Sequence, residues 1–507
     1  MSGGTMVIAA TSGPAALFPP LSAGTAERQI DEQIYDYLLV VDPNLNYRDD
    51  GRFLPRLAES WTWSADSLSI AFRINPNARW HDSEPVSARD VQFTFQLYKN
   101  PELASPTALD LQNIDSVVVR DSLTAVVWYH ARSAHQLLDA SHPAIMPRHI
   151  FENIEIRSLR EFAASAHPIG TGRFRFRNWR PDESIELDAD MNNYRGRPKL
   201  DRVIWSISPN SAAAATKFVA GAADVFTALK PENIAEVSRK AELKVMSTPA
   251  TEYSYLAFNL ARPLFASLEL RRALTMAVDR ASIVKNIFDT LASPGIGPTV
   301  RVFPTTDTAA LKQIPFDAER AKAILDSLGW RVGRDGEYRI RNDQELSFST
   351  IVSTSSSTRR RMAVLLQEQL RRVGVRMKID EMEYKTWQAR QNSRDFDATL
   401  SNMILGATPE GIRELWGVES ARQKDGSNYG AYSNSRFDAE LDSALGARRF
   451  DESKKHFTRA YQIIIDDAPA IWISDQKWVI GLKRQVKPGV IRADSWWFDL
   501  SDWSISH

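Results

Sequence analysis

Histidines, carboxylates and serines that could do chemistry occur throughout this 507-residue chain, but their spacing does not build a catalytic centre. The evenly spaced His135, His142 and His149 could share a metal if a helix placed them on one face, yet Pro143 and Pro147 break such a helix. The sequence contains no HExxH pair and no GxSxG nucleophile elbow. We therefore interpret these histidines as loop or surface residues.

Two further patterns also fall short of catalytic chemistry. The Gly170-Thr171-Gly172 turn lacks the other residues of a phosphate-binding loop, so we interpret it as a place of tight backbone packing. Asp380, Glu381 and Glu383 could be imagined as a sugar-hydrolysing pair, but we interpret them as a solvated strand end. Cysteine is absent, which excludes disulfides, thiolate nucleophiles and cysteine-based metal sites. We expect no enzymatic activity and no cofactor.

The composition is that of a globular protein of two or three domains, with 43% hydrophobic and 25% charged residues. Lys+Arg and Asp+Glu are both 63, which argues against a nucleic-acid partner because phosphate binding needs a basic excess. No apolar run is long enough to span a bilayer, and residues 1–20 lack the features of a signal peptide. We interpret 1–4 as a cloning remnant on a mature exported chain; a cytoplasmic protein that never carried a signal is the alternative.

Hydrophobic periodicity predicts α/β architecture together with one β-rich segment. Residues 49–129 are mostly β in character, and apolar side chains alternate with polar ones over 68–74. Residues 203–228 have the pattern strand, helix, strand, which is the βαβ unit of a parallel sheet. A helix ending near Val373 leads through one glycine into an alternating strand over 375–379, which predicts a second α/β domain.

Four widely separated segments carry a resemblance to a known family. They are LAESW at 57–61, HPIGTGRFRF at 167–176, YLAFNLARP at 255–263 and NYGAYSNSRFDAEL at 428–441. In this order they resemble the peptide/nickel family of ABC-importer substrate-binding proteins. The resemblance implies an α/β, periplasmic-binding-protein-like fold, with two α/β lobes joined by a hinge plus a smaller β-rich inserted domain.

The resemblance also implies domain boundaries and a motion. The first lobe would comprise 1–45, 166–256 and 472–507, the inserted domain 46–165, and the second lobe 257–471. We expect the chain to cross between the lobes near Ala257-Phe258-Asn259 and near Asp467-Ala468-Pro469, and the lobes to close around a solute by hinge bending.

The implied function is that of an extracytoplasmic or periplasmic protein that captures a solute in the interlobe cleft and delivers it to the permease of an ABC importer. A peptide or peptide-like solute is the first expectation; an oligosaccharide, an opine or a metal chelate is the alternative. A two-lobed enzyme or a ligand sensor is the alternative class. We expect a monomer with no bound metal or nucleic acid, which contacts the membrane only through the transporter or a lipid anchor.

Candidate solute contacts follow from the resemblance and from where aromatic residues fall. Aromatic faces near the predicted crossings and loops can stack on a solute, and polar residues beside them can fix its orientation. The predicted ligand-binding residues are Ser12, Gly13, Tyr253, Asn259, Asn402, Met403, Glu410, Trp416 and Tyr429. Trp61, Trp63 and Trp80 lie within family motifs and are expected to pack in the core.

Two positions depart from the family's pattern. Met403 stands where relatives have a Trp, and Thr408-Pro409-Glu410 replaces Asp-Pro-Asp. An aspartate in this region neutralises the amino terminus of a bound peptide in relatives, and Thr408 lacks the charge to do so. We therefore predict a weakened dependence on a free amino terminus, with Glu410 either substituting for the aspartate or capping the next helix. Arg271 and Arg272 are further expected to form a structural ion pair with Asp279; binding of a ligand carboxylate is the alternative.

Overall fold

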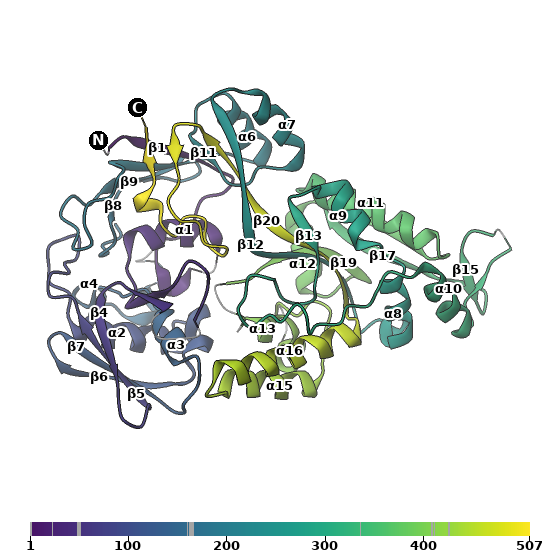
Figure 1. The fold of residues 1–507 in the computed structure, drawn as a ribbon, viewed down its shortest axis with the longest axis horizontal. Coiled ribbons are helices and arrows are strands. Elements are labelled where there is room, and N and C mark those ends of the chain that lie inside the picture. Colours follow the sequence, from purple (N-terminus) through teal and green to yellow (C-terminus); the bar gives the residue numbers. More distant parts are fainter. Residues whose placement is uncertain are drawn as a thin grey trace. The chain divides into compact units, whose positions relative to one another are not determined.

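A computed structural model describes residues 3–22, 24–47, 52–159, 161, 167–334, 336–406, 409, 411–423 and 426–506 (Figure 1). The chain divides into two compact units: unit 1 is Met1–Thr248 with Trp478–His507, and unit 2 is Pro249–Lys477. Both boundaries fall inside long strands, β12 (Leu243–Phe258) and β20 (Ala470–Lys483), so each of these strands contributes residues to both units. The boundaries of the three predicted domains stay a prediction.

Unit 1 contains a mixed sheet with its strands in the order β11, β1, β10, β9, β8. β1 is parallel to both of its neighbours, and β9 is antiparallel to β10 and β8. The segment β10, α6, β11 is the βαβ unit that the sequence predicts, with Asn210 capping α6 by accepting a hydrogen bond from the Ala213 amide at 2.8 Å. The bounds are β1 (Thr5–Ala10), β8 (Phe174–Arg180), β9 (Ser184–Ala189), β10 (Arg202–Ile207), β11 (Val225–Phe226), α1 (Thr25–Ile34), α6 (Ser211–Val219) and α7 (Pro231–Arg239).

A separate four-stranded antiparallel sheet, in the order β4, β5, β7, β6, also belongs to unit 1. Ile70, Phe72 and Ile74 of β5 are fully buried, as their period of two predicts. Trp80 is buried as expected, whereas Trp61 and Trp63 are only half-buried because they lie on the outermost strand. The bounds are β2 (Leu39–Val41), β3 (Phe53–Pro55), β4 (Ala58–Trp63), β5 (Ser69–Ile74), β6 (Ile114–Asp121), β7 (Thr124–Tyr129), α2 (Ala88–Lys99), α3 (Gln136–Ser141), α4 (Arg148–Phe151), β21 (Val486–Lys487) and β22 (Ser504–Ile505).

The Gly170-Thr171-Gly172 turn packs directly against the end of α1. A Cβ atom on Gly170 would lie 1.8 Å from the Ile34 carbonyl oxygen, and one on Gly172 would lie 2.2 Å from that of Gln33. The Gly172 amide donates to the Ile34 oxygen at 2.7 Å, and His81 bonds both glycines through its two ring nitrogens. The prediction of tight backbone packing is confirmed.

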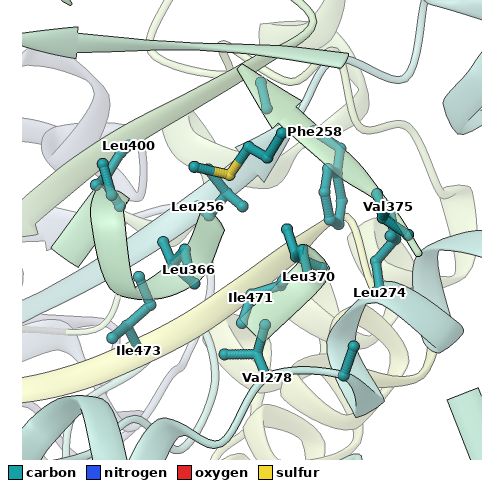
Figure 2. Packing of buried hydrophobic residues seen from close by; sticks show 14 of the residues in the cluster. Leu256, Phe258, Leu274, Val278, Leu366, Leu370, Val375, Leu400, Ile471 and Ile473 are labelled. Atoms are coloured by element: carbon teal, nitrogen blue, oxygen red, sulfur yellow. The ribbon is translucent and has the colours of Figure 1, made fainter. Parts of the chain in front are cut away.

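Unit 2 is built around strands in the order β18, β17, β19, β12. β17 is parallel to β18 and β19, while β12 is antiparallel to β19. The unit of β17, α11 and β18 contains the predicted helix, the glycine (Gly374) and the strand. Figure 2 shows the core in which α8 and α11 pack with β12, β19 and β20. The labelled residues are Leu256, Phe258, Leu274, Val278, Leu366, Leu370, Val375, Leu400, Ile471 and Ile473.

The remaining elements of unit 2 surround this core. Their bounds, with those of the strands above, are α8 (Leu268–Met276), α9 (Arg280–Phe288), β13 (Ala292–Pro294), α10 (Ala318–Ser327), β14 (Arg331–Val332), β15 (Arg339–Arg341), β16 (Gln344–Glu345), β17 (Ser347–Ser353), α11 (Ser357–Arg371), β18 (Arg376–Met382), α12 (Tyr384–Asn392), β19 (Ala398–Ile404), α13 (Ile412–Trp416), α14 (Val418–Arg422), α15 (Ser435–Gly446) and α16 (Phe450–Asp467). None of the helices in the described part of the chain is both long and apolar enough to cross a bilayer.

The predicted ion pair between Arg271, Arg272 and Asp279 is wrong. Both arginines donate to main-chain oxygens at the end of α16, Arg271 to Asp467 at 2.7 Å and Arg272 to Asp466 at 2.9 Å. Asp279 instead caps α9 by accepting from the Ser282 amide. The open carbonyl groups at a helix C-terminus attract cations, which explains the arginines' preference.

Candidate solute-binding site

Three parallel strands of unit 2 end at the same edge of its sheet. β17 ends at Ser353, β18 at Met382 and β19 at Ile404, and the antiparallel β12 brings Glu252 opposite Ile404. Ligands of open α/β sheets bind outside the carboxyl ends of parallel strands. This edge is therefore where a solute site in unit 2 is expected.

Arg359, in the first turn of α11, reaches this edge of the sheet. Its Nη2 donates to Oδ1 of Asn402, and Nδ2 of Asn402 in turn donates to Oε1 of Glu252 at 2.8 Å. The guanidinium carbon lies 4.9 Å from the ring centroid of Trp387, which is close enough for a cation–π contact. Its Nη1 is buried and has no hydrogen-bond partner among the described residues.

Burial lowers the pKa of Arg359, and the nearby Glu252, Tyr384 and Tyr255 oppose that shift. The group remains a cation, because arginine does not deprotonate in proteins. Leaving a donor of a partly desolvated cation unpaired costs free energy. A carboxylate is the partner that fits best, since it accepts two parallel N–H bonds from a guanidinium.

Two large apolar side chains at this edge of the sheet are exposed. Tyr384 is 49% exposed and Ile404 is 41% exposed, although both are large hydrophobic residues. The ring of Tyr384 lies 5.7 Å from that of Trp387, so the two aromatic residues form one wall. Large apolar side chains that stay in water beside an unsatisfied charged donor are typical of a ligand site.

Comparison with known proteins decides the family. The model of the bacterial extracellular solute-binding proteins, family 5 (middle region), matches residues 52–422. The chain belongs to this family. The oligopeptide-binding protein AppA of Bacillus subtilis is 25% identical over 511 residues, which cover 98% of this chain and 92% of AppA. A putative ABC transporter peptide-binding protein of Brucella abortus is 30% identical over 54% of this chain and 51% of its own length.

Solved structures show that this family 5 protein has the predicted fold. AppA of Bacillus subtilis in complex with a nonapeptide superposes with a TM-score of 0.84 at 23% identity, covering both chains completely. NikZ of Campylobacter jejuni in complex with Ni(L-His) superposes with a TM-score of 0.87 at 22% identity, covering 99% of each chain. The α/β, periplasmic-binding-protein-like fold class is confirmed.

Two predicted site residues of the family 5 protein lie on β19. Asn402 contacts Arg359 directly, as described above. Met403 is half-buried and stands opposite Tyr253 in the register of β12 and β19. Both residues are thus at the carboxyl edge of the sheet.

Tyr253 and Trp416 pack inside unit 2. Tyr253 is fully buried and Trp416 is 3% exposed. Trp416 lies in a chain of aromatic contacts, with ring centroids 6.1 Å from Tyr255 and 5.9 Å from Trp472, and Tyr255 contacts Tyr253 at 5.5 Å. A stacking contact of either residue with the solute stays a prediction.

Asn259 and Tyr429 differ in how their polar atoms are used. The Asn259 amide donates to the oxygens of Arg394 at 3.0 Å and Phe396 at 2.9 Å and accepts from the Ala261 amide, which occupies it within the fold. Tyr429 is half-buried against Trp387, and its hydroxyl accepts a long bond of 3.5 Å from Gln388. Tyr429 therefore remains better placed than Asn259 to reach a solute.

The remaining predicted contacts belong to unit 1 or fall outside the described residues. Ser12 and Gly13 follow β1 in unit 1, where Ser12 is exposed and a Cβ on Gly13 would lie 2.8 Å from the Ile207 side chain. Glu410 and Thr408, which carry the prediction about the solute's amino group, lie outside the described residues. These contacts stay predictions.

Arg359, Glu252, Tyr384 and Trp387 are the site residues that sequence reasoning missed. One signal was available: Arg359 follows a run of serines and threonines at 353–358, so it falls in the first turn of the next helix. A cation is unfavourable there because the helix dipole is positive at that end. A residue that opposes its local preference marks a candidate functional position.

Proposed function

We propose that this family 5 protein captures a peptide or peptide-like solute outside the cytoplasm and delivers it to the permease of an ABC importer. The names of AppA and of the Brucella relative support a peptide, and the family supports a binding protein of transport rather than an enzyme. We expect the solute to leave the protein chemically unchanged. A monomer and an exported location belong to the same proposal.

The observation that carries the proposal is the unpaired Nη1 of Arg359 at the carboxyl edge of the sheet. In the proposed complex the carboxylate of the solute accepts from this guanidinium, while Asn402 holds the other arm of the fork. The Tyr384–Trp387 wall receives the apolar group next to that carboxylate. A peptide presents both features at its carboxyl end.

An opine or a metal chelate with an organic acid offers the same carboxylate, and NikZ with its Ni(L-His) supports keeping this alternative. The discriminating feature is the amide backbone that only a peptide carries. A direct identification comes from mass spectrometry of the solute that co-purifies and is released by denaturing the protein. A peptide confirms the first expectation, and a non-peptide acid replaces it while keeping the role of Arg359.

Calorimetric titration of the wild type, Arg359→Gln and Arg360→Gln with the identified solute tests the site itself. Arg360 is the matched control, because it neighbours Arg359 on α11 but pairs with Glu381 at 2.9 Å on a half-exposed surface. We expect Arg359→Gln to weaken binding about a hundredfold, the cost of one buried charged hydrogen bond. Equal affinities in the two variants would contradict the proposal.

Hinge closure around the solute also stays a prediction of the family resemblance. Small-angle X-ray scattering with and without a saturating solute measures it. We expect the radius of gyration to fall on binding, since the solute stabilises the form in which it contacts both lobes. An unchanged radius at saturation would rule out hinge closure while leaving the Arg359 contact intact.

A further inference from the structure

Glu252, near the start of unit 2, places a carboxylate beside the Arg359 site. It stands opposite Ile404 in the register of β12 and β19, and residues directly opposite in an antiparallel pair point to the same face of the sheet. Ile404 is 41% exposed and Glu252 is half-buried. The side chain of Glu252 is therefore partly in solvent at the carboxyl edge of the sheet.

A hydrogen-bond chain links this carboxylate to the guanidinium of Arg359. Nη2 of Arg359 donates to Oδ1 of Asn402, and Nδ2 of Asn402 donates to Oε1 of Glu252 at 2.8 Å. The Asn402 amide fits only this way round, because a guanidinium has only donors and an ionised carboxylate has only acceptors. One neutral amide group thus separates the two opposite charges.

The two charges act on each other across that amide. Burial lowers the pKa of Arg359, and attraction by Glu252 is the largest effect that opposes this shift. Arg359 brings one positive charge and Glu252 one negative charge, so a solute with two carboxylates would bring two more negative charges to a pair whose own charges already cancel. Like charges in close contact disfavour binding.

Glu381, at the end of β18 on the same edge of the sheet, is held differently. Its carboxylate lies 2.9 Å from Arg360 in an exposed ion pair, so a direct cationic partner balances its charge. Glu252 reaches Arg359 through a neutral amide instead. The charge of Glu252 is therefore the one that a solute bound at Arg359 meets first.

We propose that Glu252 is a specificity residue that disfavours a second negative charge next to the solute carboxylate. This inference rests on the proposed function, in which that carboxylate lies at Arg359. The preferred solutes carry a neutral or a positively charged group beside the carboxylate, against the exposed side chains of Tyr384 and Ile404. A peptide with an acidic last residue is the kind of solute that Glu252 disfavours most.

Calorimetric titration with the tetrapeptides Ala-Ala-Ala-Gln and Ala-Ala-Ala-Glu tests the inference, because these probes differ by a single charge beside the carboxylate. We expect the wild type to bind the Gln peptide at least about tenfold more tightly. Glu252→Gln keeps an acceptor for Asn402 and removes only the charge, so the difference should fall below about threefold. Glu381→Gln is the matched control on the same edge and should keep the wild-type difference.

The remaining outcomes separate this inference from the proposed function. Equal binding of the two peptides to the wild type overturns the inference, and loss of that binding in Arg359→Gln shows that the proposed function stands. Binding of neither peptide overturns the expectation of a peptide and this inference with it. A preference that survives unchanged in Glu252→Gln, or an equal loss of both peptides in that variant, also overturns the inference, because Glu252 then acts without its charge or only orients Asn402.

Salt provides a second measurement that needs no variant. Raising sodium chloride from about 0.01 M to about 1 M shortens the screening length from about 30 Å to about 3 Å. A preference for the Gln peptide that is caused by repulsion at a partly exposed residue should narrow at least about threefold in the wild type. An unchanged preference would contradict repulsion by Glu252.

Discussion

The Gly170–Gly172 turn of unit 1 and the Arg359 site of unit 2 differ in how completely space and hydrogen bonds are used. At the turn, the space for a Cβ atom is filled by main-chain oxygens and the Gly172 amide is paired. At Arg359, a charged donor has no hydrogen-bond partner among the residues that the structure describes, and large apolar side chains stay exposed. The most recognisable sequence motif therefore maintains the fold. The candidate site is marked instead by a charged donor without a hydrogen-bond partner among the described residues and by exposed apolar side chains.

Gly170→Ala should give the largest effect. The added methyl group would overlap the Ile34 oxygen, and neither main chain can move without breaking the turn. We expect the free energy of unfolding, measured in urea, to fall by more than about 4 kcal/mol, or the variant to fail to fold. Gly446→Ala is the control, because a Cβ atom added there, at the end of α15, would meet nothing within 4 Å. Similar stabilities of the two variants would contradict the packing account.

Arg339→Met should give the next largest effect, because Arg339 is a buried arginine that makes three hydrogen bonds through Nε and Nη1. It is 3% exposed and donates to Asp326 at 2.8 Å, Trp330 at 2.7 Å and Val373 at 2.8 Å. Removing it takes the donor from the Trp330 and Val373 oxygens and leaves Asp326 with Arg331. We therefore expect the unfolding free energy to fall by about 3 kcal/mol, measured by urea unfolding. A loss below about 1 kcal/mol would show that these bonds contribute little.

A substitution of Asp475, in β20, should have an intermediate effect on stability, because its carboxylate is buried but paired with Arg301. Burial raises its pKa from 3.8 to about 7, and Arg301 opposes the shift. Between about pH 4 and pH 7 the folded state therefore holds a proton that the unfolded state has released. This residue should make the unfolding free energy fall as pH rises through that window, by at most about 1.4 kcal/mol per pH unit.

Asp475→Asn should remove this contribution, which a comparison of urea unfolding at pH 5 and pH 7 measures. The difference in stability between variant and wild type should shift in favour of the variant at the higher pH. Asp343→Asn, at an exposed position, serves as the control. A pH-independent difference for Asp475→Asn would contradict the raised pKa.

Arg359→Met should have the smallest effect on stability. It removes a partly desolvated cation whose Nη1 has no hydrogen-bond partner in the described part of the chain, although it also frees the Asn402 oxygen. We expect the unfolding free energy to stay within about 1 kcal/mol of the wild type or to rise, in contrast to Arg339→Met. A loss as large as that of Arg339→Met would show that Arg359 is a structural residue.

Much of the fold followed from local patterns, but the site depended on contacts between distant segments. Period-two alternation and a single glycine predicted β5 and the passage from α11 to β18 because such signals act within a few residues. The burial of Trp416 depends on Trp472, and the pairing of Arg359 depends on Asn402. Asn402 and Met403 are predicted as ligand-binding residues through the family resemblance, whereas Arg359 belongs to none of the motifs that carry the resemblance.

The most direct test of the Arg359 account is a calorimetric cycle with a bound peptide and its carboxyl-terminal amide, on the wild type and Arg359→Gln. The amide removes the charge on the solute and the substitution removes the charge on the protein, so the two changes report on one contact. We predict that the wild type binds the acid about a hundredfold more tightly than the amide, about 2.7 kcal/mol, and that Arg359→Gln binds both equally. A preference for the acid that survives in Arg359→Gln would contradict the account.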